Sequence, residues 1–136
     1  MQDFALDDRL ANDSVSVIIT GLCDVRLMKD RRWPWLLLVP RRPGMSEIFE
    51  LTPLDQTLLT FETNKVAATL KTVTGAAKIN VGALGNIVRQ LHVHIIARFE
   101  GDANWPGPIW GHGKAEPYAD EDMNSFMAKL RETLSQ

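Results

Sequence analysis

Alternating polar and apolar residues at positions 89–98 (RQLHVHIIAR) constrain the fold of this chain more than any other feature. Successive side chains of a β-strand point to opposite faces, so this segment has two distinct faces. The first face carries Arg89, Leu91, Val93, Ile95 and Ala97. The second face carries Gln90, His92, His94, Ile96 and Arg98. Because the first face is almost entirely apolar, we expect it to cover a hydrophobic core, with both histidines on the opposite surface, about 7 Å apart by strand rise.

Other segments also have the composition of strands, because their residues alternate in polarity, are β-branched or form a short apolar run. Together with the alternating segment, the predicted strands are residues 14–21, 25–30, 35–39, 78–83 and 88–98. Pro34 and Pro40 bound one apolar run, which favours a short buried strand over a helix. The turn-like sequence at residues 84–86 (LGN) separates the last two strands.

The longest predicted helix covers residues 52–74. Thr52 is a suitable N-cap, Pro53 fits the first helical position, and Gly75 is a natural end. Its apolar residues at roughly helical spacing are Leu54, Leu58, Phe61, Ala68 and Val73. A second helix is expected from about Asp120, where a run of acidic residues suits the helix dipole. Its apolar stripe consists of Met123, Phe126, Met127, Leu130 and Leu134.

The order of these elements predicts an antiparallel sheet with helices on one side, which is an α+β fold. Residues 100–118 contain four glycines and three prolines, which indicates an ordered loop without regular structure. With 136 residues, the chain has the length of one domain, and we interpret residues 1–136 as a single domain.

Composition excludes several classes of function. The 15 basic and 17 acidic residues give a net charge of −2, which argues against a nucleic-acid partner. Cys23 is the only cysteine, so no internal disulfide can form and a reducing, cytoplasmic setting is favoured. Residues 1–13 are acidic and mixed, unlike a signal peptide, and residues 35–39 are too short an apolar run to cross a bilayer. We therefore expect a soluble cytoplasmic protein that does not bind membranes.

The histidine pair by itself allows three interpretations. His92 and His94 are incidental polar residues on a half-exposed strand, or they act together on one substrate group, or they are two ligands of a metal ion with His112 as the third. No cysteine or carboxylate stands nearby at a familiar ligand spacing, so the sequence predicts no metal site.

Several segments together resemble the histidine triad (HIT) family of nucleotide-binding proteins and hydrolases. The family signature alternates three histidines with apolar residues, and residues 90–96 (QLHVHII) match it with Gln90 in place of the first histidine. The other matching segments are residues 34–44 (PWLLLVPRRPG), 78–86 (KINVGALGN) and 105–108 (WPGP). The resemblance covers about residues 25–108, in the same order as in the family.

The resemblance implies a HIT-like antiparallel sheet on which one long helix and a C-terminal helix pack. It also implies cleavage of a nucleoside 5′-monophosphate from a phosphoanhydride, ester or phosphoramidate, without a redox cofactor or an obligatory metal. His92 then attacks the α-phosphorus to form a nucleotidyl-histidine intermediate, and a backbone carbonyl fixes its tautomer. An unperturbed imidazole, with a pKa of about 6.5, is mostly neutral at pH 7 and so is a ready nucleophile. His94 binds the phosphate oxygens or helps to protonate the leaving group.

Three departures from the family pattern remove polar groups near the phosphates. Gln90 replaces a histidine, Trp35 replaces a further histidine, and Ile87 replaces a hydroxyl residue. If the first triad position only orients its neighbours, Gln90 can substitute and acts in catalysis beside His92 and His94. If that position must carry a proton, which an amide cannot do near neutrality, the protein is instead a nucleotide sensor or partner-binding module with little activity.

The resemblance also implies nucleotide- or phosphate-binding residues, namely Asn80, Gly85, Asn86, Asp30 and Trp105. Gly85 and Asn86 would offer amide groups to phosphates, although a Gly-Asn pair also forms simple turns. Asn80 is either a phosphate or ribose ligand or a loop cap. Asp30 binds the ribose or lies in a solvated turn, and Trp105 stacks on a base or contacts a second subunit.

The family is commonly a symmetric homodimer whose sheets join. The antiparallel strands of this chain have no other evident cover for a sheet edge. We therefore expect a homodimer whose ligand is a nucleotide or a nucleotide conjugate.

Overall fold

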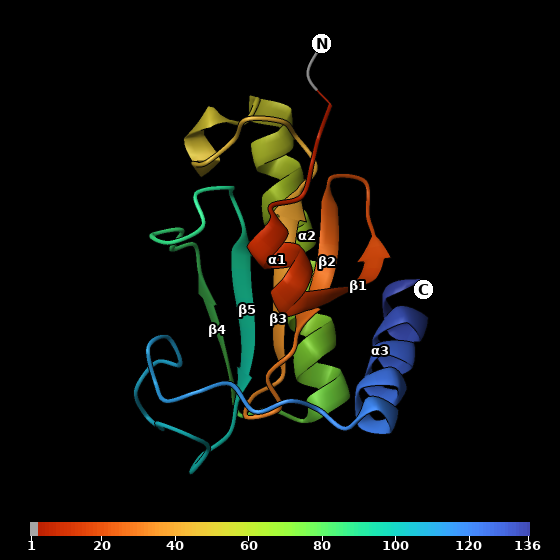
Figure 1. The fold of residues 1–136 in the computed structure, drawn as a ribbon. Helices are drawn as coiled ribbons and strands as arrows, with labels where there is room; N and C mark the ends of the chain where they lie inside the picture. The colour runs from red at the N-terminus through yellow and green to blue at the C-terminus, as the bar shows by residue number, and fades with distance from the viewer. Residues whose placement is uncertain (1–2) are drawn as a thin grey trace.

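A five-stranded antiparallel sheet runs through the protein in the computed structural model, which describes residues 3–136 (Figure 1). The strands are β1 (Ser14–Ile19), β2 (Cys23–Met28), β3 (Trp35–Pro40), β4 (Lys78–Gly82) and β5 (Val93–Arg98). Their order across the sheet is β1-β2-β3-β5-β4. The helices are α1 (Asp8–Asp13), a 3₁₀ helix η1 (Ile48–Glu50), α2 (Pro53–Thr74) and α3 (Asp120–Leu134). The predicted α+β fold is confirmed, and residues 99–119 form a loop without helix or strand, also as predicted.

Helix α2 begins and ends where the local chemistry predicts. The Thr52 hydroxyl accepts a hydrogen bond from the Asp55 amide at 3.2 Å, and Pro53 occupies the first helical position. Gly75 ends the helix with φ of 71°, a left-handed conformation that glycine adopts without steric cost. Within residues 3–136, no helix combines the length and the apolar character needed to cross a lipid bilayer.

The face that α2 turns to the core differs from the spacing of its apolar residues. Leu54 and Phe61 are 68% and 67% exposed. The buried residues are Asp55, Leu59, Glu62, Val66 and Leu70. The Glu62 carboxylate accepts hydrogen bonds from the Leu22 amide, at 3.0 Å, and from the Thr20 hydroxyl. Of the predicted apolar residues, Leu58 and Val73 pack against the core, whereas Leu54, Phe61 and Ala68 are exposed. A search for apolar residues alone misses the two carboxylates on the buried face.

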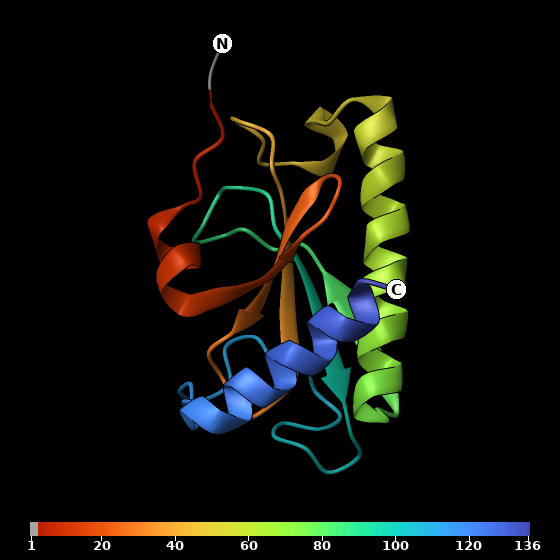
Figure 2. The ribbon, with the colours of Figure 1, turned by 90° about the vertical axis from the view of Figure 1, so that its right-hand side faces the viewer.

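Helices cover both faces of the sheet, which corrects the predicted one-sided arrangement. Figure 2 shows α2 along one side of the sheet and α1 on the other, while α3 packs against α2 and β1. The predicted stripe of α3 is confirmed, because its members pack in the main core under the sheet. Leu10 of α1 joins Leu37 and Val39 of β3 in a second cluster on the opposite face. With only six residues, α1 is too short to produce a helical period in the sequence.

Strand β5 begins later than predicted, and its second face is covered rather than open. Residues 88–92 are irregular, because the Leu91 amide donates to the carbonyl of Met45 in the loop after β3. The apolar face of the segment lies in the main core, as expected. On the other face, His92 and His94 are only 6% and 7% exposed. The histidines therefore lie in the wall of an interior site and not on an open surface.

Candidate active site

A cavity of about 360 Å³ lies between α1, the sheet and the loops at residues 84–88 and 110–111. The residues that line it are Arg9, Leu10, Asp13, Met28, Trp35, Leu37, residues 84–88, His92, His94, Trp110 and Gly111. Most of these side chains are aliphatic or aromatic, and the polar groups are few. This combination is typical of a pocket for a planar organic ligand with a polar end.

The backbone fixes the tautomer of His92. Its Nδ1 lies 2.7 Å from the carbonyl oxygen of Gln90. A carbonyl oxygen can only accept a hydrogen bond, so Nδ1 carries the hydrogen and donates it. The neutral ring then has its lone pair on Nε2, the state in which an imidazole is a nucleophile.

An indole fixes the tautomer of His94 in the opposite sense. Trp35 Nε1 donates a hydrogen bond to His94 Nδ1 at 3.0 Å, so the neutral ring carries its hydrogen on Nε2. Burial, followed by the nearby His92, lowers the pKa of His94 from 6.5 to about 3. The ring centroids of His92 and Trp110 lie 4.8 and 5.4 Å from that of His94. Near pH 7, His94 is therefore a neutral hydrogen-bond donor and not a cation.

We expect the ring proton resonances of His94 to stay constant as the pH falls from about 8 to about 5. An unfolded histidine takes up a proton near pH 6.5, whereas folded His94 does so only at about 3. The unfolded state therefore binds more protons in this window, and the contribution of His94 to the free energy of unfolding decreases as the pH falls through it. NMR titration measures this directly, with His94→Gln to assign the resonance. Trp35→Phe removes the donor at Nδ1 and is expected to raise the pKa; titration of wild-type His94 near pH 6.5 contradicts the assignment.

The structure brings Gly85 and Asn86 into the cavity wall with the two histidines. Gly85 has φ of 71°, and a Cβ at this position would lie 3.2 Å from the Val88 carbonyl oxygen. A side chain is therefore strained there both by conformation and by contact. The tight turn brings residues 84–88 to the cavity beside His92 and His94.

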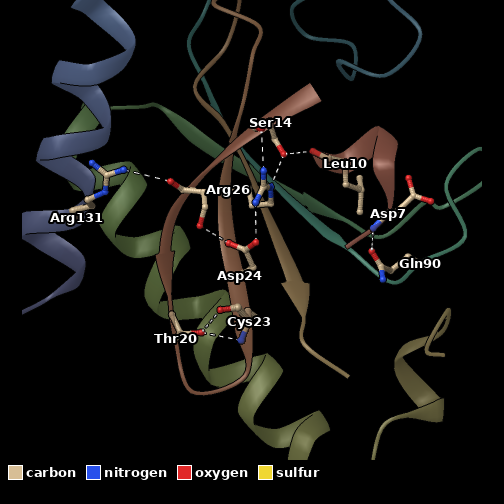
Figure 3. Close-up of polar contacts among 10 residues, drawn as sticks. Asp7, Leu10, Ser14, Thr20, Cys23, Asp24, Arg26, Gln90 and Arg131 are labelled. Atoms are coloured by element: carbon tan, nitrogen blue, oxygen red, sulfur yellow. Dashed lines mark hydrogen bonds and ion pairs between the residues drawn. The ribbon is translucent and has the colours of Figure 1, made fainter. Parts of the chain in front are cut away.

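Gln90 stands two positions before His92 in the sequence, but its side chain turns to the N-terminal segment (Figure 3). Its Nε2 donates to the Ala5 carbonyl oxygen and its Oε1 accepts from the Asp7 amide, both at 2.8 Å. It is not among the residues that line the cavity. Both polar ends of this amide are engaged by backbone in the structure.

Asn80 and Trp105 are likewise absent from the cavity wall and contact the buried Arg98. The Asn80 side-chain oxygen accepts from Arg98 Nη1 at 3.2 Å, and the Arg98 guanidinium lies 5.5 Å from the Trp105 ring centroid. Arg98 also pairs with Asp102 at 2.7 Å. These contacts connect β4, β5 and the loop that follows β5.

Asp30 is buried and paired, and so does not lie in a solvated turn. Both of its oxygens accept from the Arg32 guanidinium, and the Glu116 amide donates to it at 3.3 Å. Burial raises its pKa, but these hydrogen bonds outweigh burial and hold the pKa of Asp30 below its ordinary value. Asp30 lines a neighbouring cavity that shares Asp13, Met28 and Trp35 with the first.

The cavity residues on α1 were missed by the sequence analysis. Arg9, Leu10 and Asp13 belong to α1, for which the only local sequence signal is Asp7, an N-cap whose Oδ1 accepts from the Arg9 amide at 2.8 Å. Trp110 packs over Gly82, where a Cβ would lie 3.1 Å from the indole ring.

His112 lies apart from the histidine pair. It does not line the cavity, and its ring packs against Trp33 with the centroids 6.3 Å apart. Within residues 3–136, no three His, Cys, Asp or Glu side chains are grouped in a way that could hold a metal ion.

The chain is similar to several known proteins. A curated relative from Mycobacterium tuberculosis named AP-4-A phosphorylase is 34% identical over 99 residues, 68% of this chain and 50% of the relative. The chain thus spans about half the length of the curated relatives it matches. A histidine triad protein from Sinorhizobium meliloti has a TM-score of 0.94 and 65% identity, covering 96% of each chain. A histidine triad protein from Marinobacter aquaeolei has a TM-score of 0.97 and 45% identity, covering 99% of this chain and 98% of the other.

A model of one protein family also matches most of this chain. The HIT domain model matches residues 9–101, a segment that contains all five strands, α2 and both histidines of the cavity. The two solved relatives from S. meliloti and M. aquaeolei, which match nearly the whole length, are named histidine triad proteins. This chain belongs to the histidine triad (HIT) family.

Proposed function

We propose that the protein is a nucleotidyl hydrolase or transferase in which His92 is the nucleophile. The hydrogen bond from His92 Nδ1 to the Gln90 carbonyl is the observation that carries the proposal, because it leaves the lone pair on Nε2. Attack forms a bond between Nε2 and the α-phosphorus and breaks the bond to the leaving group, which departs with the electron pair. Water then attacks phosphorus, the electron pair returns to Nε2, and a nucleoside 5′-monophosphate is released.

His94 binds the reacting phosphate in this proposal. Its neutral ring offers an Nε2–H donor that Trp35 keeps in place, so it stabilises negative charge on the phosphate oxygens without giving up its proton. Gly85 and Asn86 contribute amide groups at the same end of the cavity. The aliphatic side chains of Leu10, Met28 and Leu37 form the part of the wall that suits the nucleoside.

Gln90 stands at the first triad position in this proposal and acts through its backbone. Its carbonyl oxygen orients the nucleophile, while its side chain binds residues 5 and 7. An amide that is already engaged at both ends does not need to titrate for the reaction to proceed. The name of the relative from M. tuberculosis supports a substrate in which phosphate links nucleosides.

A turnover assay against nucleotide conjugates tests the proposed function. The panel contains adenosine and guanosine phosphoramidates, dinucleoside polyphosphates and nucleotide sugars, with released nucleoside monophosphate as the readout. We expect release from at least one class, and loss of that release when His92 is replaced. Nucleotide binding without release from any conjugate would support a sensor or partner-binding module instead.

We also propose that the protein forms a homodimer through the β4 edge of the sheet. Strand β4 ends the strand order, and its Val81 side chain is 51% exposed. Equilibrium sedimentation is expected to give about twice the chain mass of 15.3 kDa. A single species at the chain mass contradicts the dimer.

A further inference from the structure

Helix α1 forms one wall of the candidate active-site cavity, and Gln90 binds the residues that precede this helix. The Gln90 carboxamide donates to the Ala5 carbonyl and accepts from the Asp7 amide, as a neighbouring peptide group would in a sheet. Figure 3 shows the bond to Asp7. Asp7 is the N-cap of α1, since its carboxylate accepts from the Arg9 amide at 2.8 Å. The side chain beside the nucleophile is therefore bonded to the residue that starts the helix over the cavity.

The other end of α1 is held by a buried polar network on β2. The Ser14 hydroxyl donates to the Leu10 carbonyl and accepts from Arg26 Nε, the latter at 2.7 Å (Figure 3). Arg26 also pairs with Asp24 at 2.8 Å, and both side chains are 10% exposed. Because both ends are fixed by hydrogen bonds, the residues of α1 that face the cavity keep a defined position.

Among the described residues 3–136, Arg9 is the only lysine or arginine that lines this cavity. Arg9 is exposed, and within residues 3–136 its side chain takes part in no hydrogen bond or ion pair. Most other arginines are engaged: Arg26, Arg31, Arg32, Arg42 and Arg98 each pair with a carboxylate. Asp13 lies one turn further along α1, where it also lines the neighbouring cavity with Lys29. A guanidinium without a partner, next to a site for phosphate chemistry, is suited to bind an anion.

We propose that Arg9, placed by Gln90 through α1, binds phosphate groups of the substrate beyond the one that His92 attacks. This inference rests on the proposed function. The reason is charge: the neutral His94 donates a hydrogen bond but contributes no positive charge, whereas a polyphosphate brings several negative charges into a mostly apolar cavity.

Nucleotide binding tests the proposal without requiring turnover. Trp35 and Trp110 line the cavity, so quenching of tryptophan fluorescence reports occupancy. The probes are the mono-, di- and triphosphates of adenosine and guanosine, in buffer without divalent cations. We expect the wild-type protein to bind the triphosphate roughly tenfold more tightly than the monophosphate of the same base, and added salt to reduce this ratio.

Substitutions then separate the charge of Arg9 from its position. Arg9→Gln is expected to remove the roughly tenfold preference while leaving monophosphate affinity within about twofold, and Arg9→Lys to restore part of it. Arg41→Gln is the matched control, because Arg41 is exposed and lies outside the cavity. Gln90→Met removes both side-chain hydrogen bonds to residues 5 and 7, so it is expected to reduce the preference as well. In the Gln90→Met background, Arg9→Gln should then have little further effect.

Three outcomes overturn the proposal. Equal weakening of all three phosphate lengths by Arg9→Gln makes Arg9 a contact to the base or ribose. If Arg9→Gln leaves the preference for the triphosphate unchanged, Arg9 does not bind the additional phosphates. If the effects of Arg9→Gln and Gln90→Met are fully additive, Gln90 does not act through Arg9. If monophosphates bind but no polyphosphate binds more tightly, only this inference fails; if no nucleotide binds, the proposed function fails with it.

Discussion

Replacing His92 with alanine is expected to reduce turnover by on the order of 10⁵-fold, as loss of the nucleophile does in other covalent mechanisms. The reason is the free Nε2 lone pair that the Gln90 carbonyl leaves on the ring. Without it, no nucleotidyl-histidine forms, and water would have to attack the substrate directly. His94 cannot replace His92 as the nucleophile, because its bond with Trp35 leaves the hydrogen on Nε2.

The measurement combines steady-state turnover with mass spectrometry of protein mixed rapidly with substrate. Wild-type protein should gain the mass of one nucleotidyl group, and His92→Ala should not. His112→Ala is the matched control, since His112 is exposed and outside the cavity, and it should keep the wild-type rate. Retained nucleotide binding and unchanged circular dichroism establish that His92→Ala is folded. Turnover by His92→Ala at the wild-type rate would disprove the nucleophile assignment.

Asp102→Ala is expected to lower the free energy of unfolding by about 3–5 kcal/mol, because it leaves a buried arginine without its carboxylate. The Arg98 side chain is 1% exposed and donates to Asp102 through both Nε and Nη2. Asp102 also accepts from the Phe99 amide at 3.0 Å. Arg98 further donates to the Gly107 carbonyl at 2.8 Å, so the substitution loosens the loop that carries Trp110.

The ion pair between Arg31 and Glu116 is the solvent-exposed counterpart of the buried pair between Arg98 and Asp102. Its side chains are 59% and 50% exposed, and Glu116→Ala is expected to change stability by no more than about 1 kcal/mol. Urea denaturation measures both variants. Equal effects of Asp102→Ala and Glu116→Ala would mean that burial of Arg98 does not decide the cost.

The pKa of Asp102 gives a second readout of the same pair. Burial raises this pKa, but the hydrogen bonds from Arg98 and the Phe99 amide outweigh burial and lower it below the ordinary 3.8. The stabilisation is therefore present above that value and is lost as the pH falls through the lowered pKa. Asp102→Ala should reduce this part of the acid sensitivity.

Local patterns in the sequence were sufficient for the regular elements. Alternation predicts β5, and the combination of Thr52, Pro53 and Gly75 predicts both ends of α2, because capping depends on residues close in sequence. The buried face of α2 was predicted only in part, because Leu58 and Val73 pack against the core and Leu54 and Phe61 do not. Glu62 is buried because it accepts from Leu22 and Thr20 in the turn between β1 and β2, and a pattern within one helix cannot contain that contact.

The residues of the candidate site also divide into those that a local pattern predicts and those that depend on long-range contacts. The alternation predicts His92 and His94 on one face, and both line the cavity although β5 begins only at Val93. Asn80 and Trp105 were expected at the ligand and instead contact Arg98, whose burial depends on the packing of the whole loop after β5.

The sequence by itself determined the sheet, the long helix and the paired histidines, since all of these depend on periodicity and short-range chemistry. Only the tertiary structure decided what Gln90 does, because its two partners stand 83 and 85 positions away. The same long-range contacts set α1 over the cavity and bring Arg9 to its wall. Hydrogen bonds between distant segments form only when the chain has folded, and no local pattern records them.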